Sequence, residues 1–273
     1  MSPDRDLATL RAEVGAVPAW YHSIELAPGL VTPGFFDLRG IVARLPWPDL
    51  SGLRCLDIGT YDGFYAFEME RRGAAEVVAA DLGDLAALDW PATQRATGPG
   101  WIAEHAGAEM GRGFRIAAAA LGSRVERIEL SAYDLSPEAV GSFDFVNCGS
   151  LLLHLRDPVR ALEAIHTVTR CHFMSTEQIS AKLSLLAPRT PAATLDGQSR
   201  MFQWWVPNAS GHRRMLESAS FEIERAIRPL PIPFGSTQAT PPRTLRRMPD
   251  RVMRHLVAGG DGVPHASLLA QSR

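Results

Sequence analysis

The stretch RCLDIGTYDGF, residues 54–64, constrains the fold of this chain more than any other. Its apolar residues up to Ile58 form the short run that is typical of a strand covered on both faces. Gly59 and Gly63 then allow a sharp turn and the close approach of a ligand. The stretch therefore predicts a buried strand, a tight glycine turn and the start of a helix.

The segments that follow complete a strand–helix–strand unit. We predict a helix over residues 64–72, with glutamates early, arginines late and Gly73 as its stop. A second strand over residues 76–80 ends in Asp81. This order of elements is typical of a nucleotide-binding βαβ unit. The alternative is a plain α/β turn with incidental acids.

The glycine turn does not have the features of a phosphate site. A dinucleotide fingerprint has three glycines, whereas here the spacing is Gly-x-x-x-Gly after Asp57, and the only lysine of the chain is Lys182. A loop with an acid and no basic residue suits S-adenosylmethionine, which has no phosphate and carries a cationic ammonium and sulfonium. We place Asp57 near the ammonium, and Asp81 at the ribose diol by the geometry that serves NAD.

Three sequence blocks resemble a known family. Residues 56–63, LDIGTYDG, resemble motif I of class I S-adenosylmethionine-dependent methyltransferases. WYHSI at 20–24 and TPGFFDLR at 32–39 are similar to the subfamily related to tRNA wobble-uridine (5-oxyacetate/5-methoxyuridine) methyltransferases. The resemblance extends from about Trp20 to the C-terminus. It implies a Rossmann-like α/β fold with a seven-stranded, mostly parallel sheet into which the last strand returns antiparallel.

We expect one domain over residues 1–273. Residues 1–50 would form an N-terminal cap and residues 51–273 the core. We expect insertions into this core at residues 82–122, 179–210 and 229–262.

Composition limits the partners. The formal net charge of −2 argues against a strongly basic nucleic-acid binder, so a small-molecule substrate is favoured over tRNA. Cys55, Cys148 and Cys171 fall in predicted buried strands without zinc-site spacing, which favours core thiols in a reducing cytosol. No signal peptide or long apolar run is visible, so we expect a soluble cytoplasmic protein that does not bind a membrane.

The N-terminal region contains an aromatic cluster before any core strand. A helix is predicted over residues 3–15 and another over 35–45. Between them stand Trp20, Tyr21 and His22. They could form a lid over the pocket, or a hydrophobic staple with a solvated histidine. The family resemblance favours the lid.

The ends of the later strands supply further candidate contacts, because ligands of open parallel sheets bind at the C-terminal ends of strands. The third strand is predicted over residues 125–130 and the fourth over 143–148. Asp134 matches the position at which the family holds the adenine amine, although a turn acid is the alternative. The complete predicted cofactor set is Asp57, Gly59, Thr60, Tyr61, Gly63, Asp81, Leu82, Tyr133, Asp134, Gly149 and Ser150.

Candidate catalytic and substrate residues come from three regions. If the acceptor is a hydroxyl, a base helps to remove its proton, and His22 and His154 are the candidates, with Tyr21 as a positioning hydroxyl. For His154, simple packing is the alternative. No metal-ligand cluster is visible, so none is predicted. The predicted substrate platform consists of Trp20, Gln203, Trp204, Trp205 and Asn208.

The preferred function is methyl transfer from S-adenosylmethionine to an oxygen or nitrogen of a small polar or planar molecule. One alternative is cofactor-consuming chemistry that releases methylthioadenosine, by internal cyclisation or aminocarboxypropyl transfer. A second is tRNA wobble-uridine methylation, which is favoured by the arginines between residues 243 and 254. A third is a non-catalytic cofactor-binding protein. The sequence leaves open whether the methyl of the donor is carboxylated, and the oligomeric state.

Overall fold

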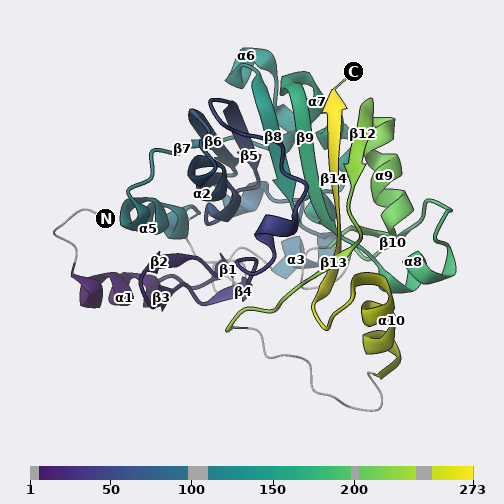
Figure 1. Cartoon of the computed structure of the whole chain (residues 1–273), viewed down its shortest axis with the longest axis horizontal. Coiled ribbons are helices and arrows are strands. Elements are labelled where there is room, and N and C mark those ends of the chain that lie inside the picture. Colours follow the sequence, from purple (N-terminus) through teal and green to yellow (C-terminus); the bar gives the residue numbers. More distant parts are fainter. Residues whose placement is uncertain (1–5, 98–109, 198–202, 238–247, 273) are drawn as a thin grey trace.

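The central sheet follows the strand order of an open α/β fold. The computed structural model describes residues 6–97, 110–197, 203–237 and 248–272. Seven strands follow the order β12-β14-β9-β8-β5-β6-β7, and β13 pairs beside β14 (Figure 1). The eight strands of this sheet are β5 (Arg54–Ile58), β6 (Glu76–Asp81), β7 (Glu126–Glu129), β8 (Phe143–Gly149), β9 (Thr169–Gln178), β12 (Phe221–Ala226), β13 (Leu230–Ile232) and β14 (Val263–Ser272).

The five strands from β5 to β9 are parallel, while β14 runs antiparallel to β9 and β12. The expected antiparallel return of the last strand is therefore confirmed. The sheet has one strand more than the predicted seven, because β13 folds back onto the start of β14. The chain moves outward from β5 to β7 and then crosses to β8, so the strand order reverses between β5 and β8.

Helices cover both faces of the sheet. One face packs against α2 (Phe64–Arg71) and α5 (Arg112–Leu121), and the other against α7 (Pro158–Val168) and α9 (Ala209–Ser218). The remaining helices are α1 (Leu7–Gly15), α3 (Ala92–Thr97), α6 (Pro137–Val140), α8 (Ala181–Leu186) and α10 (Met248–Ala258). In the described ranges, no helix is both long and apolar enough to cross a membrane.

One cysteine departs from the sequence expectation. Cys55 and Cys148 are buried, but Cys171 is exposed, so the prediction of three core thiols was wrong. The pairing of β8 with β9 shifts register between Phe143 and Phe145, which face Thr169 and His172. The two intervening residues of β9 therefore bulge out of the ladder, and Cys171 is one of them.

The N-terminal segment after α1 forms a cap of short strands. β1 (Trp20–His22) pairs in parallel with β4 (Gly34–Phe36), and β2 (Glu25–Ala27) forms a hairpin with β3 (Leu30–Val31). The helix predicted over residues 35–45 was therefore wrong: it is replaced by β4 and a short 3₁₀ turn, η1 (Val42–Arg44). Pairing with β1 overrides the local apolar pattern.

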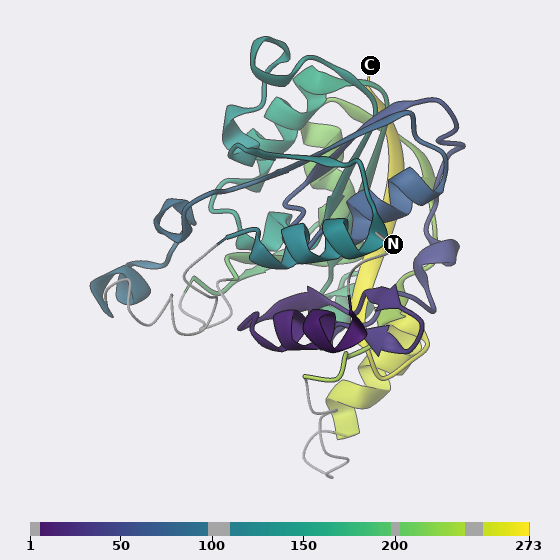
Figure 2. The same ribbon diagram turned by 90° about the vertical axis from the view of Figure 1, so that its left-hand side faces the viewer.

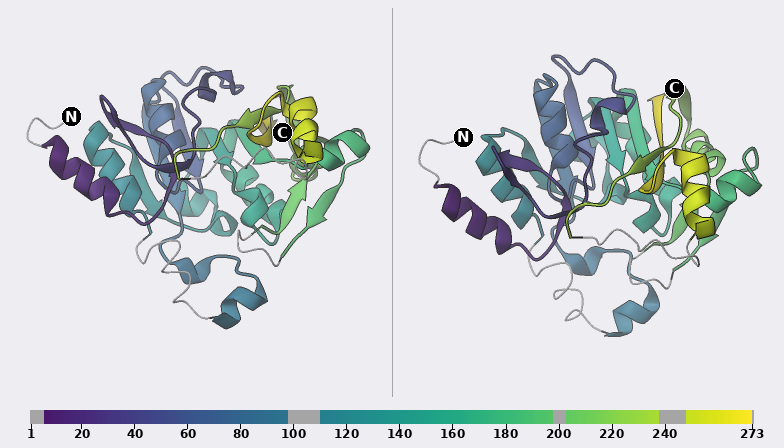
Figure 3. Two further views of the ribbon diagram at one scale, coloured as in Figure 1. Left: turned by 90° about the horizontal axis from the view of Figure 1, so that it is seen from below. Right: turned by 60° about the horizontal axis from the view of Figure 1, so that its bottom comes forward.

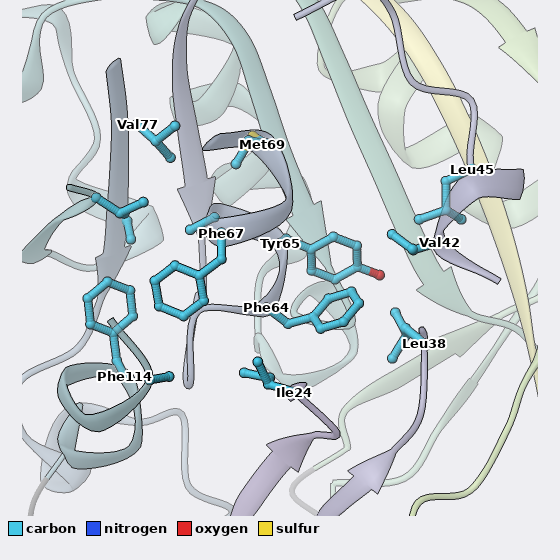
Figure 4. Packing of buried hydrophobic residues seen from close by; sticks show 14 of the residues in the cluster. Ile24, Leu38, Val42, Leu45, Phe64, Tyr65, Phe67, Met69, Val77 and Phe114 are labelled. Atoms are coloured by element: carbon cyan, nitrogen blue, oxygen red, sulfur yellow. The ribbon is translucent and has the colours of Figure 1, made fainter. Parts of the chain in front are cut away.

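The segment after β13 completes the cap from the far end of the chain. The Gly235 amide donates to the Phe35 carbonyl at 2.7 Å, and the Asp37 amide to the Pro233 carbonyl at 3.0 Å. Figure 3 shows this segment reaching from β13 to the cap strands, and Figure 2 shows α1 beneath α5. Side chains of the cap share one buried cluster with α2, as Ile24 and Leu38 beside Phe64 illustrate (Figure 4).

One buried carboxylate joins the cap to the glycine turn. Oδ2 of Asp62 accepts the backbone N–H groups of Tyr21 at 2.8 Å and His22 at 2.7 Å. Oδ1 lies 2.5 Å from Nδ1 of the His22 ring, and Asp62 is only 1% exposed. Hydrogen bonds to a buried carboxylate are strong, and their loss leaves the donors unsatisfied. Asp62 therefore fixes the entry of the cap onto the core.

Removing this carboxylate should be far more costly than removing a surface acid of the same cap. We expect Asp62→Ala to lower the free energy of unfolding by roughly 3 kcal/mol or more, because two buried amides lose their acceptor. The control is Asp37→Ala, whose pair with Arg39 is largely exposed and should contribute less than about 1 kcal/mol. Urea titration measures both, and equally small changes would contradict an anchoring role for Asp62.

Candidate functional site

The candidate site lies where the C-terminal ends of β5, β6, β8 and β9 meet the cap. This edge contains the point at which the strand order reverses, where open α/β sheets bind their ligands. Polar and acidic side chains reach this edge from the strands, and aromatic side chains reach it from the cap.

The turn after β5 is locked onto the acid at the end of β6. Gly59 has φ of +70°, and Tyr61 has φ of 49° although it is not glycine. The Tyr61 amide donates to Oδ2 of Asp81 at 2.7 Å, and the Leu82 amide donates to Oδ1 at the same distance. Burial raises the pKa of Asp81, and these two hydrogen bonds oppose the shift. The left-handed backbone at Tyr61 is thus held by the carboxylate predicted to bind ribose.

Gly63 has a packing role in addition to the one predicted. A Cβ atom built on Gly63 would lie 2.5 Å from the Phe67 ring and 2.7 Å from the Phe114 ring. This glycine begins α2 with φ of 92°, and it is buried against the core beneath the turn. The core thus excludes a side chain at this position, and the contact of Gly63 with the cofactor stays a prediction.

Beneath the turn, Asp57 and Asn147 form a buried pair on neighbouring strands. Asn147 Nδ2 donates to Asp57 Oδ1 at 2.8 Å. Oδ2 of Asp57 and Oδ1 of Asn147 are buried and accept no hydrogen bond from the described residues. Burial raises the pKa of Asp57 to about 6, which the Asn147 hydrogen bond opposes. The two acceptor atoms without partners require donors from elsewhere.

At the end of β8, Ser150 has a left-handed backbone with φ of 54°. Its amide donates to the Thr176 carbonyl at 2.9 Å, and its Oγ lies 3.1 Å from Nε2 of His265 in β14. A non-glycine residue in this conformation is strained, and such residues are frequent at functional sites. His265 is only 1% exposed, and sequence reasoning did not identify it.

Glu177, at the end of β9, holds the loop after Ser150. Its Oε1 accepts the amides of Leu151 at 3.1 Å and Leu152 at 3.2 Å, while the buried Oε2 has no partner among the described residues. Burial raises the pKa of Glu177 to about 8. A glutamate that is largely protonated at neutral pH therefore supports this edge of the site.

Half-buried aromatic rings form a wall beside Ser150, which we call the aromatic wall: Tyr21, Phe36 and Phe234. The rings of Tyr21 and Phe36 lie 5.2 Å apart between centroids, and those of Phe36 and Phe234 stack at 6.3 Å. The Tyr21 phenol also hydrogen-bonds with the Ser150 side chain. Sequence reasoning missed Phe36 and Phe234, although the FF pair within the TPGFF block was a usable signal for the first.

Part of the predicted substrate platform lies elsewhere in the structure. Trp20 is 1% exposed and donates to the Val14 carbonyl at 3.1 Å, with its ring against Gly113 of α5, so it belongs to the core. Asn208 is fully buried, where it caps α9 and donates to the carbonyls of Ala187 and Thr190. Both predictions are corrected, since neither side chain can reach a substrate.

The other platform residues tie the insertions together. The Trp204 indole donates to the Asp89 carbonyl at 2.7 Å, and the Trp205 indole donates to the Arg156 carbonyl at 3.0 Å. Nε2 of Gln203 lies 3.5 Å from Oε1 of Gln178. These three residues are half-buried. Their role in substrate binding stays a prediction.

On the side predicted for adenine, Asp89 connects several segments. The Tyr133 hydroxyl donates to Oδ2 of Asp89 at 2.6 Å, and the Arg156 amide donates to the same oxygen at 2.7 Å.

Two other predicted site residues lie on short turns. Asp134 is exposed on η3 (Ala132–Asp134), and His154 is half-buried on η4 (Leu152–His154). Among the described residues, no three His, Cys, Asp or Glu side chains lie close enough together to hold a metal ion.

The raised pKa of Glu177 predicts a pH-dependent stability. From its ordinary value of 4.5 up to about 8, the folded protein holds a proton that the unfolded chain has released. The stabilisation from protonated Glu177 is therefore full below pH 4.5 and is lost as the pH rises to about 8. The slope is at most about 1.4 kcal/mol per pH unit.

Substitution should remove this dependence. We expect Glu177→Gln to gain stability relative to the wild type as the pH rises through this range, measured by urea titration at each pH. Glu217→Gln is the control, because Glu217 is an exposed glutamate whose pKa Arg213 lowers. If the difference in unfolding free energy between the wild type and Glu177→Gln stays constant with pH, Glu177 is not protonated in the folded protein.

Comparisons with known proteins agree with this geometry. Residues 56–171 match the model of a methyltransferase domain family. No curated protein sequence matches the chain. A candidate S-adenosylmethionine-dependent methyltransferase from Listeria monocytogenes is 12% identical, with 83% of this chain and 94% of that chain covered at a TM-score of 0.50. A candidate methyltransferase from Haloferax volcanii, solved with the methyltransferase activator Trm112, is 14% identical, with 84% and 85% covered at a TM-score of 0.50.

These two solved structures show the fold, and the domain match covers the glycine turn, the strand ends of β6 and β8 and the helix between β8 and β9. The predicted fold is confirmed. The chain therefore contains a match to a methyltransferase domain within the Rossmann-like fold of class I S-adenosylmethionine-dependent methyltransferases.

Proposed function

We propose that the protein methylates an oxygen or nitrogen of a small planar molecule that binds against the aromatic wall. The observation that carries this proposal is the position of the wall beside Ser150, at the strand ends where the cofactor binds in this fold. Half-buried aromatic rings favour a flat apolar partner, with a few polar groups to orient it. The acceptor would lie between the wall and the methyl donor.

Buried acceptors fit the methionine end of the cofactor. Oδ2 of Asp57 and Oδ1 of Asn147 have no donor from the described residues, and the cofactor ammonium would supply one. Asp81 would hold the ribose diol, with Leu82 beside it, while Gly59, Thr60 and Tyr61 form the turn along the cofactor. Asp134 would meet the adenine amine on the side of Tyr133. Gly149 would lie along the methionine portion, and Ser150 at its end.

The electrostatic surroundings of the wall suit a cationic donor. Burial raises the pKa of Tyr21, and the nearby carboxyl groups of Glu177 and Asp62 raise it further. Because Glu177 is largely protonated at neutral pH, the carboxylate of Asp62 is the group that favours a sulfonium and opposes an additional carboxylate on the transferred methyl. Aromatic faces add to the stabilisation of a cation, by about 0.5–2 kcal/mol. A plain methyl donor is therefore preferred over a carboxylated one.

S-adenosylmethionine supplies an already activated methyl group, so the protein mainly aligns nucleophile, methyl and sulfur. The cap contributes by placing Tyr21 against the turn and by excluding water. His22, bound to Asp62 and 5% exposed, acts in this proposal chiefly as part of the anchor. His154 stays a candidate base.

The tRNA alternative is less well supported. Arg243, Arg246 and Arg247 lie outside the described residues. Arg251 pairs with Asp261 and Arg254 with Asp250, so these two charges are partly neutralised. The cofactor-only chemistry and the non-catalytic binding protein stay as alternatives that product analysis separates.

Cofactor affinity should depend on the ionisation of Asp57. The pKa of this carboxyl is about 6 in the free protein, so it loses its charge as the pH falls below that value. We expect the affinity for S-adenosylmethionine to fall by up to tenfold per pH unit below about pH 6. Calorimetry between pH 5 and 7 should show a smaller slope for Asp57→Asn and an unchanged slope for the exposed control Asp49→Asn. An undiminished slope in Asp57→Asn would exclude the ammonium contact.

The acceptor proposal is tested with a panel of phenols, aromatic amines and nitrogen heterocycles. We expect methylated product and S-adenosylhomocysteine in equal amounts. Methylthioadenosine would instead support cofactor-only chemistry, and absence of turnover a binding protein. Phe36→Leu and Phe234→Leu should raise the acceptor KM about tenfold, since each removes an aromatic contact of the wall. Trp205→Leu is the control from the originally predicted platform and should change the KM less than the wall variants.

A further inference from the structure

Three neighbouring strands each present one buried oxygen atom without a hydrogen-bond partner. These atoms are Oδ2 of Asp57 in β5, Oδ1 of Asn147 in β8 and Oε2 of Glu177 in β9, and none accepts a hydrogen bond from the described residues. β8 lies between β5 and β9 in the sheet, and all three strands are parallel (Figure 1). The proposed contact with the cofactor ammonium uses the first two atoms. Oε2 of Glu177 has no donor from either source.

Glu177 lies at the level of the proposed methyl acceptor. The pairing of β8 with β9 ends at Gly149, so Glu177 stands beside Ser150, where the methionine portion of the cofactor would end. Its Oε1 accepts the backbone amides of Leu151 at 3.1 Å and Leu152 at 3.2 Å. These two hydrogen bonds hold the carboxyl group in place, and they leave Oε2 as the oxygen that is free to meet a ligand.

The titratable groups that the structure places around Glu177 are neutral near pH 7. Burial raises the pKa of Cys148 in β8, of Tyr21 in the cap and of Tyr65 in α2, so these three groups keep their protons. Burial lowers the pKa of His265, in the neighbouring strand β14, to about 4. None of these groups supplies a positive charge. Burial therefore raises the pKa of Glu177 to about 8 in the free protein, with only hydrogen bonds to oppose the shift.

We propose that Glu177 is the proton acceptor of the methyl transfer, and that the cationic sulfonium of the methyl donor ionises it. This inference rests on the proposed function and adds a catalytic residue to it. A positive charge at short range favours the carboxylate form and lowers the pKa of a carboxyl group. Binding of the donor thus converts a protonated glutamate into a base. The acceptor that such a base serves is a neutral molecule with hydrogen on the oxygen or nitrogen that is methylated.

The step balances in atoms and charge. The acceptor atom forms a bond to the methyl carbon, and the carbon–sulfur bond breaks with its electron pair staying on sulfur. The proton of the acceptor atom passes to Oε2 of Glu177. The positive charge of the sulfonium and the negative charge of the carboxylate disappear together, so the buried site gains no net charge. Without the sulfonium, the pKa of Glu177 returns to its raised value, and the proton leaves to solvent when the next donor molecule binds.

The first experiment measures proton release on ligand binding and needs no acceptor. S-adenosylhomocysteine carries the same ammonium as S-adenosylmethionine but no sulfonium, so the difference between the two ligands isolates the sulfonium. Calorimetry at about pH 7.5, in buffers of different ionisation enthalpy, counts the released protons. Relative to S-adenosylhomocysteine, S-adenosylmethionine should release about half a proton more from the wild type than from Glu177→Gln. Protons that the ligands themselves exchange cancel in this comparison.

Glutamine separates proton acceptance from support of the loop. Its amide oxygen can still accept the backbone amides of Leu151 and Leu152, while the free oxygen of Glu177 is lost. The affinity for S-adenosylhomocysteine should therefore stay within about threefold of the wild type. Glu217→Gln makes the same substitution at an exposed glutamate of α9, and it should release as many protons as the wild type. Equal proton release from the wild type and Glu177→Gln would overturn the inference.

The second experiment measures turnover with a neutral acceptor from the panel. In Glu177→Gln, kcat should fall about 100-fold or more, as expected when a general base is lost. An acceptor that is already ionised, such as 4-nitrophenol above its own pKa, needs no base, and its kcat should change less than about threefold. A kcat for the neutral acceptor that stays close to the wild-type value, with the loss appearing in His154→Gln, would assign the base to His154 and overturn the inference.

Failure of this inference differs from failure of the proposed function. If the panel is methylated but Glu177→Gln behaves like the wild type, Glu177 is not the base and the proposed function stands. If no member of the panel is methylated, both fall. Carbon-13 NMR of the glutamate carboxyl groups in the wild type gives a check that needs no folded variant. One buried carboxyl should ionise with S-adenosylmethionine and stay protonated with S-adenosylhomocysteine, and the absence of such a resonance would overturn the inference.

Discussion

The carboxylate of Asp62 is the interaction on which the two halves of the site depend. It belongs to the glycine turn that we propose to hold the cofactor, yet it binds the backbone of the strand that carries Tyr21 and His22. Because the glycine turn and strand β1 share this buried carboxylate, hydrogen bonds fix the distance between them. The aromatic wall and the end of β8 are placed relative to each other through this contact.

The strand–turn–helix–strand unit that we propose to hold the cofactor could be predicted from the sequence because its signals are local. Strand, turn, helix and acid follow one another between Arg54 and Asp81, and their order alone places Asp57 and Asp81 at neighbouring strand ends. The packing role of Gly63 could not be predicted. A side chain there would collide with the Phe67 and Phe114 rings, and no local pattern distinguishes a glycine that faces solvent from one that faces a neighbouring helix.

The acceptor half could not be predicted in the same way, because its residues come from distant segments. Phe36 lies beside the other aromatic residues because β4, which replaces the helix expected there, pairs with β1. Phe234 and His265 come from the last forty residues of the given sequence and contact Phe36 there. Trp20 shows the converse error. A dense aromatic cluster indicated a pocket, but the ring of Trp20 packs instead between α1 and α5.

The pairing of residues 233–237 with the cap also has a consequence for biosynthesis. Strands β5 and β6 and the turn between them precede Phe234 and His265 in the chain, so they leave the ribosome before these two residues. The aromatic wall and the contact between Ser150 and His265 therefore cannot form until the segment after β13 and strand β14 have been synthesised. This later part of the chain thus completes both features of the site.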